Sequence, residues 1–174
     1  GQESCGIAVT DTYGARKVHS KKGLGLVNEV FDEEALEGLK GNLGVGHVRY
    51  STAGATKVEN AMPLVLNYVK GTLAIAHNGN LTNAHSLRRE LEKKGSIFAS
   101  SSDTEILMHL IRHSEQENFL DKLKESLRQV QGGFAYLIMR EDKLYAALDP
   151  NGFRPLSIGR MKNGAWVVSS ETCA

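Results

Sequence analysis

Short apolar runs separated by turn-forming residues dominate the first half of the chain. They predict strands at residues 5–10, 16–20, 43–47 and 72–77, with a short helix at 33–39. The segment 11–14 has the polar and glycine-containing composition of a tight turn, which predicts a hairpin between the first two strands. This half is therefore expected to be mainly β-structure.

The spacing of apolar positions changes near Asn83. Spacings of three and four residues predict a helix starting there, a second at Thr104–His113 and a third at 119–130. Ser102 or Asp103 is expected to cap the second helix. Further strands are predicted at 134–139, 144–148, 156–158 and 165–169. Strands, then helices, then strands is the order of an α+β layered fold.

Composition narrows the class of protein. The 174 residues suffice for one domain, and 41% of them are hydrophobic and 24% charged. Lysine and arginine number 21 against 20 acidic residues, so a basic surface for nucleic acid is not expected. No apolar run is long enough to cross a bilayer, and the two cysteines, Cys5 and Cys173, predict a reducing cytoplasm. The chain is therefore expected to act on or bind a small molecule.

A cationic, hydroxyl-rich segment follows the predicted strand at 43–47. Arg49 at a strand end could bind a carboxylate through paired hydrogen bonds, and the alternative is a structural salt bridge with an acid such as Glu59. His47, considered by itself, is a packing or capping histidine in the main interpretation and a ligand in the minor one.

The pair Asn78-Gly79 follows another apolar strand and has two interpretations. Local evidence favours a tight turn. The alternative is an oxyanion hole, in which the Asn78 amide and the Gly79 N–H point at developing negative charge.

Asp103 begins a predicted helix, so capping is its expected role in isolation, although an acid there could also bind an ammonium group. His109 and His113 lie four residues apart on the same helix, a spacing that suits zinc. No third ligand accompanies them in the sequence, so a metal site is not expected.

Six segments, in order, resemble the class II, N-terminal-nucleophile glutamine amidotransferases. They are residues 1–4 (GQES), 23–27 (GLGLV), 46–50 (GHVRY), 77–81 (HNGNL), 101–105 (SSDTE) and 149–156 (DPNGFRPL). The resemblance covers the whole chain and is strongest to members that make phosphoribosylamine from phosphoribosyl pyrophosphate, the first step of purine biosynthesis. It implies a transferase that takes ammonia from glutamine.

The resemblance also implies roles for individual residues. Arg49 would bind the α-carboxylate of glutamine and Asp103 its α-ammonium group. Asn78 and the Gly79 N–H would form the oxyanion hole, which reverses the local preference for a turn. Tyr50 and Thr52 would lie in a loop that closes over bound glutamine. No metal or cofactor is implied in this domain.

One departure concerns the nucleophile. In the family it is an N-terminal cysteine that precedes the GQES segment by one strand and one helix, and its α-amine serves as the base. Gly1 supplies neither group, and Cys5 corresponds to a small buried residue. We therefore expect a partial domain, residues 1–174, that is inactive by itself and poorly soluble or self-associating.

The family fold is a four-layer αββα sandwich, expected here without its first strand and helix. The resemblance places a phosphoribosyltransferase domain, with its magnesium, outside this chain, and allows an iron–sulfur cluster in the parent enzyme. The parent is expected to be a homo-oligomer that binds glutamine and neither nucleic acid nor membrane.

Two alternatives stay open. One is a non-catalytic glutamine-binding or scaffolding domain, which an upstream cysteine codon would argue against. The other is the glutaminase domain of a sugar-phosphate amidotransferase, which a following isomerase-like domain would favour.

Overall fold

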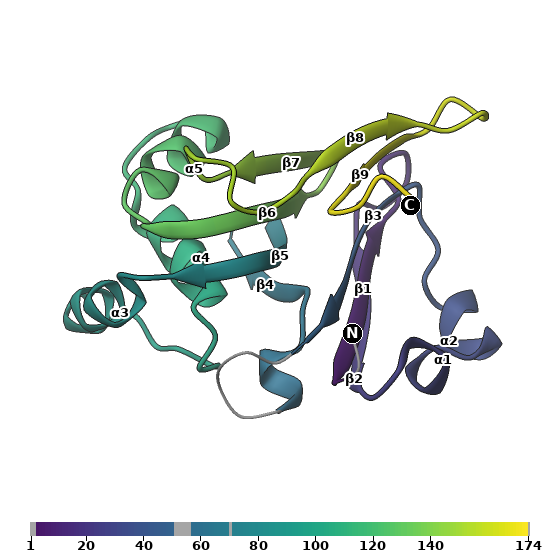
Figure 1. Cartoon of the computed structure of the whole chain (residues 1–174), viewed down its shortest axis with the longest axis horizontal. Coiled ribbons are helices and arrows are strands. Elements are labelled where there is room, and N and C mark those ends of the chain that lie inside the picture. The colour runs from purple at the N-terminus through teal and green to yellow at the C-terminus, as the bar shows by residue number, and fades with distance from the viewer. Residues whose placement is uncertain (1–2, 51–56, 70, 174) are drawn as a thin grey trace.

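The computed structural model describes residues 3–50, 57–69 and 71–173. Strands come first, helices follow, and strands return at the end, as the sequence predicts (Figure 1). Two antiparallel sheets and a separate hairpin make up the β-structure. The fold is therefore a mixed α/β arrangement with several sheets.

The first sheet contains three strands in the order β2-β1-β3. Its strands are β1 (Ser4–Thr10), β2 (Val18–Leu24) and β3 (Leu43–Arg49). Two short helices, α1 (Val27–Val30) and α2 (Glu33–Glu37), follow β2, and α1 contacts both β1 and β2. Arg49 is the last residue of β3 and pairs with Ser4, so the start of β1 fixes the position of the strand end.

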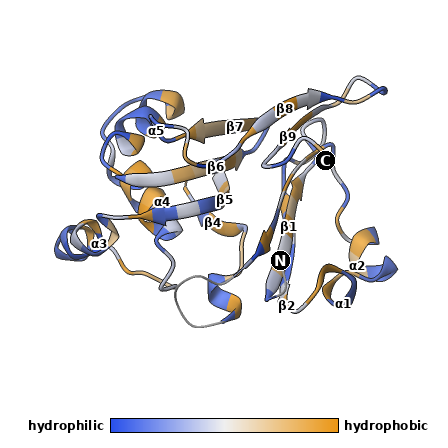
Figure 2. Ribbon diagram, in the orientation of Figure 1, coloured by the Kyte–Doolittle hydropathy of each residue, from blue (hydrophilic) through white to orange (hydrophobic). Residues whose placement is uncertain are grey.

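The second sheet contains four strands in the order β4-β5-β6-β7. They are β4 (Leu64–Tyr68), β5 (Gly71–Leu81), β6 (Gly132–Arg140) and β7 (Lys143–Leu148). Helices α3 (Ala84–Lys93), α4 (Thr104–His113) and α5 (Phe119–Leu127) lie together beside this sheet (Figure 1). Helix α4 is buried along almost its whole length, and part of it is coloured hydrophobic in Figure 2.

Two clusters of buried side chains hold these elements together. The larger cluster joins α4 and α5 to the four-stranded sheet and includes Ile106, Leu107, Ile75 and Ile138. The smaller joins the two sheets through small or flexible residues such as Ala8, Ala74 and Met139. Because β3 contacts β5 and β6, the ends of strands from different sheets meet at one place.

Several predicted elements differ from those observed. Strand β4, helix α1 and the 3-10 turn η1 (Val58–Asn60) were not predicted, and the third helix ends at Leu127. The last two strands, β8 (Ser157–Arg160) and β9 (Trp166–Ser169), pair only with each other in the part of the chain that the structure describes. The four-layer sandwich and its missing strand and helix stay predictions.

Candidate functional site

A cavity of about 550 Å³ opens where β3, β5 and the loop before α4 come together. Its lining includes Arg49, Tyr50, Asn78, Gly79 and Asp103. Five of the six residues to which the resemblance assigns roles therefore share one cavity, although they come from three separate segments. The sixth, Thr52, lies outside the described residues.

The pair Asn78-Gly79 lies inside a strand. Both residues belong to β5 and pair with Ala135 and Phe134 of β6, so the tight-turn interpretation is wrong. Gly79 has φ +133°, and a Cβ there would lie 2.0 Å from the carbonyl oxygen of Gly133. Because any side chain would both strain the backbone and collide with β6, glycine is required at this position. Strand β5 therefore continues through these two residues, and both of them line the cavity.

Asp103 points toward β5, not along its own helix. It occupies the N-cap position of α4, but its side chain makes no capping hydrogen bond. The Leu81 N–H donates to Asp103 Oδ2 over 2.8 Å, and His77 Nδ1 lies 3.5 Å from Asp103 Oδ1. Instead, Ser102 Oγ accepts from the Thr104 N–H at 3.3 Å. Asp103 is thus the N-cap residue by position, as predicted, but its carboxylate is held at the cavity wall and does not cap the helix.

The charge of Asp103 is stabilised by its neighbours. Burial alone would raise the pKa of its carboxyl group, but the hydrogen bond and charge of His77, with the Leu81 amide, outweigh that effect and lower the pKa below its ordinary value. The group is therefore ionised at neutral pH. A negative charge facing the cavity can bind a cation such as an ammonium group.

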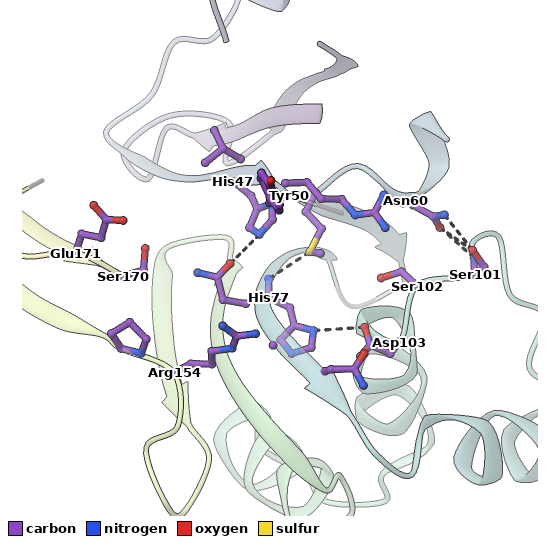
Figure 3. Close-up of a pocket in the computed structure, with 17 residues that line it drawn as sticks. His47, Tyr50, Asn60, His77, Ser101, Ser102, Asp103, Arg154, Ser170 and Glu171 are labelled. Carbon is purple, nitrogen blue, oxygen red and sulfur yellow. Dashed lines mark hydrogen bonds and ion pairs between the residues drawn. The ribbon is translucent and has the colours of Figure 1, made fainter. Parts of the chain in front are cut away.

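His77 was not identified from the sequence as a site residue. It is buried, its ring stacks on Tyr136 with 4.2 Å between centroids, and its Nδ1 lies 3.1 Å from Thr104 Oγ1. Its backbone N–H reaches Met62 Sδ at 3.3 Å, which ties β5 to the segment after η1 (Figure 3). These contacts fix the ring that lies beside Asp103. They come from distant parts of the chain, so no local pattern indicates them.

Glu105 fixes the loop that leads to Asp103. Its carboxylate accepts hydrogen bonds from the Ala99 and Ser100 N–H groups, both at 2.8 Å, and from Ser100 Oγ at 2.5 Å. His109 Nε2 lies 3.5 Å from Glu105 Oε1, the oxygen that accepts from the Ala99 N–H. Burial opposes ionisation, but the hydrogen bonds of His109, Ser100 and Ala99 lower the pKa of Glu105 to about 2.

His109 and His113 have different neighbours. His109 lies against Glu105, whereas His113 Nε2 lies 2.8 Å from Ser96 Oγ. Within residues 3–50, 57–69 and 71–173, no three His, Cys, Asp or Glu side chains are grouped as metal ligands.

Side chains of both charges line the cavity. Arg49 and Arg154 are cationic, and Asp103 and Glu171 are acidic. Figure 3 places Arg154, Ser170 and Glu171 on one side and Asp103 on the other. Arg154 was not singled out from the sequence, although it lies in the DPNGFRPL segment. Such a lining suits a small molecule that carries both a carboxylate and an ammonium group.

The chain is similar to known proteins over nearly its whole length. Residues 47–174 match the model of a protein family described as the glutamine amidotransferase domain. The chain belongs to this family. It is 49% identical to the amidophosphoribosyltransferase of Staphylococcus aureus strain MRSA252 and 51% identical to that of Bacillus subtilis strain 168, covering 100% of this chain in both cases. The predicted resemblance is confirmed.

The structural comparison agrees with the sequence comparison. A solved glutamine phosphoribosylpyrophosphate amidotransferase from B. subtilis, complexed with ADP and GMP, matches with a TM-score of 0.91 and 49% identity. The match covers 99% of this chain and 36% of that chain. The chain likewise spans only 35% and 36% of the two curated relatives, about a third of their length. No helix among the described residues is long and apolar enough to cross a bilayer.

Proposed function

We propose that this chain is the glutamine-binding part of an enzyme that hydrolyses the glutamine amide and uses the ammonia to make phosphoribosylamine in purine biosynthesis. The observation that carries the proposal is the joint lining of one cavity by Arg49, Asn78, Gly79 and Asp103. Family membership and the identity to amidophosphoribosyltransferases support the reaction class.

Some of the cavity residues bind glutamine, and others stabilise the charge that develops during hydrolysis. Arg49 binds the α-carboxylate of glutamine and the ionised Asp103 binds its α-ammonium group, so the amino-acid end of the substrate is held from both sides. Asn78 and the Gly79 N–H stabilise the negative charge that develops on the amide oxygen during attack. Tyr50, a cavity-lining residue that is 72% exposed, would cover bound glutamine together with Thr52.

Neither cysteine of this chain is placed to act as the nucleophile. Cys5 lies on β1 and is buried, and burial raises the pKa of its thiol. Cys173 is exposed, and neither residue lines the cavity. A thiol acts as a nucleophile only as the thiolate. We propose that the 174 residues bind glutamine without hydrolysing it.

The wider assignments are also proposals. The domain would adopt the four-layer αββα sandwich, with helices outside two facing sheets. The complete enzyme would be a cytoplasmic homo-oligomer with a magnesium-dependent phosphoribosyltransferase domain, and an iron–sulfur cluster would belong to the parent enzyme and not to this domain.

The test is to compare glutamine-dependent and ammonia-dependent synthesis in the full-length protein. Asp103→Asn should lower glutamine-dependent kcat/KM by about 10- to 100-fold, the worth of one hydrogen bond to a charged group. Ammonia-dependent synthesis should persist, because added ammonia does not require this cavity. Asp142→Asn is the matched control, since Asp142 is exposed and its ion pair with Arg16 is 4.0 Å long. Equal loss of both activities would indicate a folding effect, and unchanged glutamine-dependent synthesis in a folded Asp103→Asn variant would refute the assignment.

A further inference from the structure

The two ends of the Asn78 amide differ in what they can do. Its NH₂ donates hydrogen bonds, whereas Oδ1 only accepts them and would repel a developing negative charge. The two ends have nearly the same size, so the shape of the cavity cannot distinguish them. A neighbouring group must therefore determine which end faces the substrate.

His47 lies at the oxygen end of that amide. Its Nε2 is 3.1 Å from Asn78 Oδ1, a contact drawn as a dashed line in Figure 3. Since Oδ1 only accepts, the proton of this hydrogen bond belongs to Nε2. The Asn78 NH₂ is then directed away from His47. The contact crosses between the sheets, because His47 comes from β3 and Asn78 from β5.

The protonation of the ring decides the orientation. Burial lowers the pKa of His47 and outweighs the opposing hydrogen bonds of the Asn78 side chain and the His77 backbone, so the ring is neutral at pH 7 and carries one proton. With that proton on Nε2, the ring donates to Oδ1. With the proton on Nδ1, Nε2 would accept from the Asn78 NH₂ and the amide would reverse. Only the first arrangement leaves the NH₂ free for the substrate.

The surroundings of the other ring nitrogen favour the same tautomer. His47 Nδ1 is buried and meets no hydrogen-bond partner among the residues that the structure describes. A proton on Nδ1 would therefore be a buried donor without an acceptor, which is costly. The proton on Nε2 has Asn78 Oδ1 as its acceptor.

We infer that His47 is a positioning residue, whose Nε2–H holds the Asn78 amide with its NH₂ directed at the reacting amide oxygen of glutamine. The inference rests on the proposed function, because it assigns His47 a role only through the oxyanion hole. His47 also lines the cavity, and the role inferred for it acts through Asn78. Its local sequence indicates only a packing or capping histidine, and the contact with Asn78 gives it a more specific role.

The experiment compares two substitutions of similar size in the full-length protein. His47→Gln keeps an N–H of similar reach, whereas His47→Met has none. His47→Met should lower kcat for glutamine about tenfold, because Asn78 Oδ1 then lacks a partner whenever the NH₂ faces the substrate. KM for glutamine should stay within about twofold, since binding depends on Arg49 and Asp103. His47→Gln should recover most of the kcat.

Three controls separate a positioning role for His47 from a general loss of folding. His85→Met makes the same change at an exposed position on α3 and should leave kcat unchanged. Ammonia-dependent synthesis and thermal unfolding report whether each variant is folded. In an Asn78→Ala background, His47→Met should cause no further loss, because His47 then has nothing to position.

The outcomes distinguish the inference from the proposed function. If Asn78→Ala retains full glutaminase activity, the oxyanion hole and hence the proposed mechanism fail. If Asn78→Ala is impaired and His47→Met is not, the positioning role alone is wrong. Equal losses in His47→Gln and His47→Met, or additive losses with Asn78→Ala, would also overturn it.

Discussion

Replacing Glu105 with glutamine should destabilise the domain through the loop that precedes Asp103. The Glu105 side chain is only 11% exposed, and it accepts hydrogen bonds from two backbone N–H groups and one hydroxyl. Lowering its pKa from 4.5 to about 2 corresponds to about 3 kcal/mol, which residual screening by solvent reduces to about 2 kcal/mol. Glu105→Gln should therefore lower the free energy of unfolding by about 2–4 kcal/mol, because the NH₂ of the new glutamine side chain would face N–H and O–H donors and could not accept from them.

The Glu105 carboxylate also makes the stability of the domain depend on pH, with lower stability in acid. Its pKa is lower in the folded protein than in the unfolded chain, so its contribution is fully present above about pH 5. The contribution is lost as the pH falls from about 4.5 toward 2, where the folded protein also takes up the proton. The difference in stability between wild type and Glu105→Gln should shrink over that range.

Denaturant unfolding at pH 7 and at intervals down to pH 3 measures both effects. Glu92→Gln is the matched control: Glu92 pairs with Arg88 at 3.2 Å but is 49% exposed, so its loss should cost no more than about 0.5 kcal/mol. Equal destabilisation by the two substitutions would refute the assignment of a special role to Glu105. A difference that does not change with pH would mean that the charge of Glu105 is not the cause.

Three other outcomes are expected. Asn78→Ala in the full-length protein should lower kcat for glutamine by about 10²–10³-fold with little change in KM, as steady-state kinetics would show; a rise in KM alone would contradict this. In the folded chain, iodoacetamide should label the exposed Cys173 and leave the buried Cys5 unmodified, which peptide mass mapping would check. The isolated chain should self-associate with rising concentration in light scattering, because Phe153, Ile158 and Trp166 are 71%, 69% and 69% exposed; Ile158→Lys should reduce the association, and a monomer at all concentrations would count against it.

Much of the fold could be predicted from local patterns. Apolar runs located β1, β3, β5 and β6, and helical spacing located α4 with the bounds that the structure has. The missed elements are short. Helix α1 has four residues and no buried residue; the Leu26 N–H at its N-cap donates to the Glu29 carboxylate at 2.7 Å, and the helix contacts β1 and β2. Such segments carry little periodicity to detect.

The site was harder to predict because its contacts join distant segments. The resemblance identified the residues, and the structure shows how Arg49, Asn78 and Asp103 come to share a cavity. Local patterns indicated a helix cap at Asp103. They could not indicate the hydrogen bond that its carboxylate accepts from the Leu81 amide, because Leu81 lies 22 residues away in the sequence. His77 gave no local signal, since its partners lie on the segment after η1, on α4 and on β6.

The most direct test of the central claim removes one charged group of the substrate at a time. Hydrolysis of glutamine by the full-length protein should be compared with that of glutaramic acid, which lacks the α-amino group, and of 4-aminobutanamide, which lacks the α-carboxylate. Wild type should prefer glutamine over each by about 10- to 100-fold in kcat/KM, and Asp103→Asn should abolish only the preference over glutaramic acid. If Asp103→Asn retains that preference, Asp103 does not bind the ammonium group and the proposed site is wrong.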